Sequence, residues 1–71
     1  MRQMIALLDY AAKRKDYTPQ QMAISTEMGL STWFRRKQYP EEFRLGELQE
    51  ISKKLDIDFV IHSGDVVAKM V

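Results

Sequence analysis

Hydrophobic residues recur every three or four positions over four stretches of the chain and then change to a strand-like pattern near its end. The first spacing places apolar side chains along one face of a helix, and β-forming runs around a two-residue turn are typical of a hairpin. Helices are predicted at about residues 2–15, 19–28, 31–38 and 44–55, and a hairpin at about residues 59–70. We therefore expect a single, mainly α domain over residues 1–71, with four helices followed by a C-terminal β-hairpin.

The apolar stripes of the predicted helices indicate which side chains form the hydrophobic core. In the short third helix, the bulky Trp33 is expected to anchor the helix inward, while the cationic residues that follow it face solvent. The other expected core residues are Ile5, Leu8, Ala12 and either Met1 or Met4 in the first helix, Met22, Ala23 and Ile24 in the second, and Leu45, Leu48, Ile51 and Leu55 in the fourth.

Signals for the start of a helix are clearest at residue 18. Thr18 can be the N-cap, Pro19 occupies the first helical position, and Gln21 sits where a capping box has Glu or Gln. Ser31 is expected to cap the third helix. Tyr39-Pro40 is expected to end it, because the residue before a proline avoids the helical region.

The C-terminal hairpin is expected to turn at Ser63-Gly64, where Gly64 supplies the positive φ that such turns require. A lone two-stranded hairpin is only marginally stable in water. It must therefore pack on the helices, pair with a second subunit, or both. We expect it to form the interface of a homodimer, and the candidate interface residues are Phe59, Ile61, Val66 and Val67.

Composition excludes several classes of function. The 71 residues contain no cysteine and only one histidine, so disulfides and thiolate metal sites are excluded and no metal site is expected. The three glycines are widely spaced, and no nucleophile or metal-ligand motif occurs. The apolar run at residues 4–8 is too short for a signal peptide or a membrane span. We expect a cytoplasmic protein that is not an enzyme, with no cofactor, no small-molecule substrate and no membrane partner.

Charge is distributed unevenly, although the net charge is only +1. Residues 1–40 contain seven basic and three acidic side chains, whereas residues 41–71 contain four basic and seven acidic ones. This asymmetry suits a protein with one side that faces DNA and another side that faces away from it.

Residues 18–57 resemble a known family. The runs Met22-Ala23, Trp33-Phe34-Arg35-Arg36 and Pro40-Glu41-Glu42-Phe43, followed by a helix with leucine and isoleucine at helical spacing, are similar to the Cro/repressor (XRE-like) helix-turn-helix group of phage and prophage regulators. The closing helix, of the form Leu-x-x-Leu-x-x-Ile-x-x-x-Leu, is the more specific part. The resemblance implies a sequence-specific regulator that binds operator DNA as a dimer, as a repressor or Cro-like switch component.

The sequence departs from the family pattern in the turn between the second and third helices. Family members usually have a short side chain, often Ala, four residues before a glycine. If Ala23 is the short residue, Glu27 falls where the glycine should be; if Gly29 is the turn glycine, Ser25 replaces the alanine. The first register preserves the spacing to the arginines. The second has better local chemistry, because glycine tolerates a left-handed conformation and glutamate does not readily do so, and it is the register that we expect for the turn.

The third predicted helix meets the physical requirements of a recognition helix: it is short and presents cationic and polar side chains to base edges in the major groove. Arginine can bind guanine or phosphate through two hydrogen bonds, and backbone amides at a helix start suit phosphate. The base-reading candidates are Ser31, Thr32, Arg35 and Arg36. The phosphate-binding candidates are Thr18, Gln20, Gln21, Lys37 and Tyr39.

Two other interpretations stay open. The near-neutral charge and the acidic second half are compatible with a protein-interaction module of the same fold without DNA binding, of the antirepressor or toxin-neutralising type. The aromatic residues Trp33, Phe34 and Tyr39, which lie near cations, are compatible with binding of single-stranded nucleic acid by base stacking.

Overall fold

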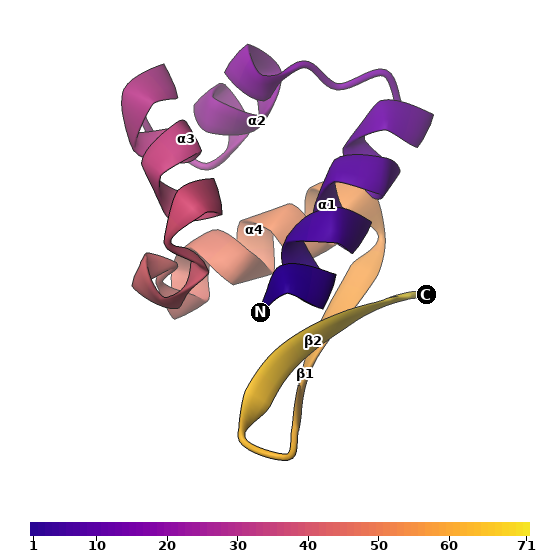
Figure 1. Cartoon of the computed structure of the whole chain (residues 1–71). Helices are drawn as coiled ribbons and strands as arrows, with labels where there is room; N and C mark the ends of the chain where they lie inside the picture. Colours follow the sequence, from indigo (N-terminus) through magenta and orange to yellow (C-terminus); the bar gives the residue numbers. More distant parts are fainter.

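Four α-helices and a C-terminal hairpin follow one another in the computed structural model, which describes all residues 1–71 (Figure 1). The predicted fold class is therefore confirmed. The elements are α1 (Arg2–Arg14), α2 (Pro19–Ser25), α3 (Leu30–Gln38), the short 3-10 helix η1 (Pro40–Glu42), α4 (Leu45–Leu55), β1 (Ile57–His62) and β2 (Asp65–Met70).

The helices form one body, and the hairpin extends from it beside α1 and the end of α4 (Figure 1). β2 packs on α1, whereas β1 follows directly from α4. β1 and β2 are antiparallel, with Ile57 opposite Met70 and His62 opposite Asp65. The hairpin begins at Ile57 rather than near residue 59, because Asp56 ends α4 in a left-handed conformation and turns the chain straight into the strand.

The core lies where the four helices and the base of the hairpin meet. Trp33 is 1% exposed and meets the ring of Phe43 edge-on at a centroid distance of 6.0 Å, so it anchors α3 as predicted. Ile57 and Ala68 bring the sheet into the same core. The other buried hydrophobic residues are Met4, Leu8, Ala11, Ala12, Met22, Ala23, Ile51 and Leu55.

Two of the expected core residues lie at the surface. Ile24 is 68% exposed, because Met22 and Ala23 already turn the inner face of the seven-residue helix α2 toward the core. Leu45 is 73% exposed, because it is the first residue of α4 and lies at the end of that helix remote from the buried Ile51. Both predictions of burial were wrong.

The turn between α2 and α3 adopts the first of the two registers. Glu27 has φ +57°, whereas Gly29 has φ −71° and ψ 159°, so Glu27 and not Gly29 is the left-handed residue. The N–H of Met28 donates to the carbonyl of Ala23 at 2.9 Å, and that of Glu27 donates to Ile24 at 3.1 Å. These two bonds define a Schellman motif, in which the residue after the C-cap is left-handed.

This motif ends α2 at Ser25 instead of residue 28, and Gly29 instead of Ser31 is the N-cap of α3. The expectation that favoured Gly29 as the left-handed residue was therefore wrong. In contrast, the turn of the hairpin is as predicted: Ser63 and Gly64 both have positive φ, at 53° and 78°. Two successive positive values are typical of the type I′ turns that match the twist of a hairpin.

Candidate nucleic-acid interface

α2, the turn at residues 26–29 and α3 form the unit that could dock on a duplex. Successive residues of an α-helix are about 100° apart around its axis, so the buried Trp33 determines which side chains of α3 point outward. Ser31, Arg35 and Gln38 lie roughly opposite Trp33, and all three are exposed. Sequence reasoning found the first two and missed Gln38, although the predicted burial of Trp33 already places Gln38 on the outer side of the helix.

Arg35 is the most accessible cation of α3, with 62% of its side chain exposed. It already has a partner: Nε lies 2.9 Å from one carboxylate oxygen of Glu42, and a terminal nitrogen donates to the other at 3.2 Å. Its guanidinium also stacks over the ring of Tyr39 at 5.4 Å. The hydrogen bond and the charge of Glu42 raise the pKa of Arg35, and the same bond lowers the pKa of Glu42.

Arg36 occupies a different environment from its neighbour. Its side chain is only 14% exposed, and Nε donates to Glu47 of α4 at 3.2 Å. Glu42 lies 3.7 Å from a second nitrogen of the same guanidinium. Arg36 therefore fastens α3 to α4, and base contact would require it to leave two acidic partners.

Glu47 is the acidic centre of this junction. Burial raises the pKa of Glu47, but hydrogen bonds from the Arg44 backbone and the Arg36 guanidinium outweigh burial and hold the pKa below its usual value. The bond from the Arg44 N–H is 2.9 Å long. The Glu47 carboxylate thus caps the first turn of α4 and also holds the end of α3 against α4.

The phosphate-binding candidates are only partly available. Lys37 contacts Asp9 of α1 at 2.6 Å. Thr18 and Gln21 form the predicted capping box: the Thr18 N–H donates to Gln21 Oε1 at 2.8 Å, and the Gln21 N–H donates to Thr18 Oγ1 at 3.2 Å. Gln20 is exposed beside them. Tyr39 is 42% exposed, under the guanidinium of Arg35.

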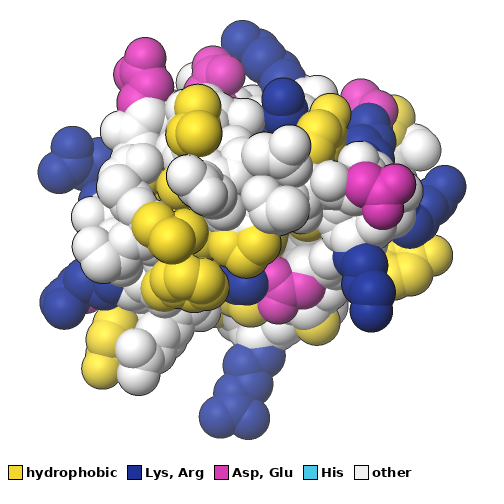
Figure 2. Space-filling view, turned by 90° about the horizontal axis from the view of Figure 1, so that it is seen from above, with side chains coloured by type: hydrophobic (Ala, Val, Ile, Leu, Met, Phe, Trp, Pro, Cys, Tyr) yellow, Lys and Arg dark blue, Asp and Glu magenta, His cyan; other side chains and the backbone are white.

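Hydrophobic side chains gather on the face of the molecule that contains α2, and both basic and acidic side chains project around them (Figure 2). Large apolar residues of α2 and α3 are exposed: Ile24 to 68%, Leu30 to 43% and Phe34 to 50%. The sequence did not reveal this surface, because Ile24 was expected inside. Trp33 is buried, so the largest of the three aromatic side chains is not available for stacking on bases.

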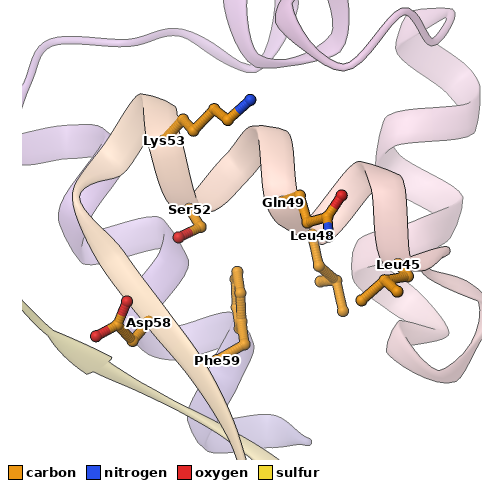
Figure 3. A pocket seen from close by; sticks show the side chains of 7 residues that line it. All are labelled: Leu45, Leu48, Gln49, Ser52, Lys53, Asp58 and Phe59. Atoms are coloured by element: carbon orange, nitrogen blue, oxygen red, sulfur yellow. The ribbon is translucent and has the colours of Figure 1, made fainter.

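A second candidate surface lies between α4 and β1, where a groove of about 520 Å³ opens (Figure 3). Leu45 and Leu48 of α4 and Phe59 of β1 form its apolar side. Ile61, which follows on the same strand next to the turn of the hairpin, is 79% exposed. Phe59, Ile61 and Val66 share the face of the sheet that looks toward the helices, whereas Val67, paired with Val60, is on the opposite face.

The two edges of the hairpin differ. The side-chain amide of Gln3 donates to the carbonyl of Ala68 at 2.5 Å and accepts from its N–H at 2.7 Å, so α1 covers the edge of β2. The backbone groups of Ala68 thus point away from β1, so Ala68 and Phe59 form a non-hydrogen-bonded pair. The N–H and C=O groups of Phe59, and those of Ile61 two residues further on, therefore point toward the outer edge of β1. Beside this edge, the hydroxyl group of Ser52 donates a hydrogen bond to the carbonyl of Ile57 at 2.6 Å.

Comparison of the chain with protein-family models, with curated proteins and with solved structures finds no significant match. None of the helices combines the length and the apolar character that crossing a membrane requires. No three His, Asp or Glu side chains gather closely enough to hold a metal ion.

Proposed function

We propose that this protein is a sequence-specific duplex DNA-binding regulator of transcription, a Cro-like repressor of phage or prophage type that acts as a homodimer in the cytoplasm. One observation carries the proposal. The short helix α3 is anchored by Trp33, follows a Schellman turn, and presents Ser31, Arg35 and Gln38 on the side away from the core. Occupation of a promoter would repress transcription without catalysis or a cofactor.

The ion pair of Arg35 does not oppose this function. Exposed ion pairs contribute little to stability because water and salt screen them, and 62% of the Arg35 side chain is exposed. Arg35 can therefore exchange Glu42 for a guanine or a phosphate when the helix enters the major groove. Thr32 lies at the border of this face and Arg36 lies behind it, so Arg36 supports α3 rather than contacting bases.

The edge of β1 supports dimer formation. Antiparallel pairing of β1 with β1 of a second copy would join the free backbone groups of Phe59 and Ile61 and bring apolar side chains against the groove beside Leu48. An uncovered strand edge beside an apolar surface favours such pairing. A two-fold axis through this sheet would present two copies of α3 to half-sites about one helical turn, about 34 Å, apart.

Fluorescence anisotropy of a labelled random-sequence duplex, titrated at low and at moderate salt, tests DNA binding. We expect binding that weakens steeply with salt, because Lys and Arg displace counterions from phosphates. Arg35→Ala should weaken it further, whereas Lys69→Ala, which removes an exposed cation from the hairpin, should have a smaller effect. Absence of binding at low salt, or equal effects of the two variants, would contradict the proposed interface.

A protein-interaction module is the second candidate. The observation that favours it is that Arg35, Arg36 and Lys37 all have acidic partners within the chain, beside an exposed apolar surface. A module of this kind would bind no duplex at low salt, and Arg35→Ala would leave that result unchanged. The same titration therefore separates the two candidates.

A further inference from the structure

Two large apolar side chains lie on the outer part of α3 and are not explained by the core. Leu30 is 43% exposed and Phe34 is 50% exposed, and neither belongs to the buried cluster. They are four residues apart, so they are neighbours along one ridge of the helix. This ridge runs beside the row formed by Ser31, Arg35 and Gln38.

The chemistry of the major groove offers one apolar partner for such a ridge. Guanine, adenine and cytosine present hydrogen-bonding groups there, whereas thymine adds a C5-methyl group. A leucine and a phenylalanine in the groove would leave polar base edges dehydrated unless they met methyl groups. We propose that the Leu30–Phe34 ridge recognises thymine methyl groups in the half-site that α3 contacts; this inference rests on the proposed function.

The spacing of the two side chains adds a constraint on the site. Four residues of an α-helix advance about 6 Å along its axis, and successive base pairs are about 3.4 Å apart along each strand. Leu30 and Phe34 would therefore contact thymines one or two base pairs apart. Arg35, adjacent to Phe34 and 62% exposed, would contact a neighbouring guanine or phosphate.

Charge favours DNA over an apolar protein partner at this ridge. The row beside the ridge, formed by Ser31, Arg35 and Gln38, is polar or cationic. A docking site for an apolar protein surface would have to dehydrate Arg35 and Gln38 together with the ridge. A major groove satisfies both kinds of side chain, because it contains methyl groups next to hydrogen-bonding edges.

The test begins with selection of duplexes from a randomised library by the full-length protein. The selected duplex is then made in a thymine form and in a form with deoxyuridine at every thymine, which removes only the methyl groups. We expect about a fourfold loss of affinity for each contacted methyl, the factor that corresponds to burial of one methylene-sized group. Fluorescence anisotropy measures both affinities.

Variants connect this loss to the ridge. Phe34→Ala should bind the thymine duplex more weakly and should distinguish the two forms of the duplex less than the parent protein does. Tyr10→Ala removes an aromatic side chain of similar exposure, 55%, from α1 and should keep the full difference. Circular dichroism confirms folding, which Phe34→Ala should preserve because Phe34 lies outside the core.

Three results would overturn the inference while leaving DNA binding intact: selected sites without closely spaced thymines, equal affinity for both forms of the duplex, or an undiminished difference in Phe34→Ala. If the protein binds no duplex at low salt and the library yields no site, the proposed function fails together with the inference. The ridge would then be assigned to contact with a protein.

Discussion

Glu27 occupies a backbone conformation that costs stability, and its replacement by glycine should stabilise the protein. Its φ of +57° lies in the left-handed region, where a side chain costs about 1–2 kcal/mol. Glycine removes this strain but loses about 0.5–1 kcal/mol more conformational entropy on folding. The expected net gain in the free energy of unfolding is about 0.5–1 kcal/mol. For a domain of this size, this raises the midpoint of thermal unfolding by about 2–8 °C.

Gly29 provides the complementary test. Its φ of −71° and ψ of 159° are ordinary for any residue, and an added Cβ would meet no atom within 4 Å. Serine is a better N-cap than glycine and restricts the unfolded chain, and α3 has no side-chain cap at present. Gly29→Ser should therefore stabilise the protein by about 0.5–1 kcal/mol.

Thermal and urea unfolding, followed by circular dichroism, measure both variants against Asp16→Gly. Asp16 has φ 58° after α1, but aspartate tolerates this region better than glutamate, so its replacement should gain less. If Gly29 were the left-handed residue instead, Gly29→Ser would destabilise the protein and Glu27→Gly would bring no gain. That result would refute the register of the turn and would shift the start of α3.

The ion pairs of α3 and the free edge of β1 lead to other measurable outcomes. Glu42→Gln releases Arg35, so affinity for a random duplex should rise about two- to fivefold at low salt and less at high salt; an unchanged affinity would show that Glu42 does not compete with DNA. Because the pKa of Glu47 is lowered on folding, its stabilising effect is complete above the ordinary glutamate pKa of about 4.3 and is lost as the pH falls through the folded value. Glu47→Gln should thus cost about 1–2 kcal/mol at pH 7 and progressively less in urea titrations as the pH falls below the ordinary glutamate pKa, whereas a cost independent of pH would contradict the assigned charge. Ile61→Asp, at a position 79% exposed, should turn a dimer into a folded monomer in sedimentation experiments; a variant that remains dimeric would place the interface elsewhere.

Signals that act within a few residues were predicted well. The capping box of Thr18 and Gln21 forms as expected, because both of its hydrogen bonds join residues three positions apart. The turn at Ser63-Gly64 forms for a similar reason, since two adjacent residues with positive φ suffice to reverse the chain. The identity of Trp33 as the anchor of α3 also followed from size and hydrophobicity, which favour burial of the largest apolar side chain.

The candidate site was predicted only in part, because the availability of a cation depends on partners distant in the sequence. Ser31 and Arg35 lie on the outer face of α3, as the base-reading prediction requires, but the guanidinium of Arg36 is held by Glu47, eleven residues away. Lys37 is held by Asp9 of α1. Glu47 and Asp9 belong to other helices than the cations that they hold, so the pattern within α3 did not indicate which of its cations would be free.

The sequence by itself determined the element types, their order and most of the core, because these depend on periodicity, capping and turn residues within short segments. Only the tertiary structure decided that the left-handed residue is Glu27. Hydrogen bonds at the end of α2 and the packing of α3 on the core outweigh the local preference for glycine. Tertiary contacts also decided which edge of the hairpin is open, because Gln3 of α1 covers Ala68 and leaves Phe59 and Ile61 uncovered. Contacts between distant segments depend on how the helices pack together, which local spacing does not encode.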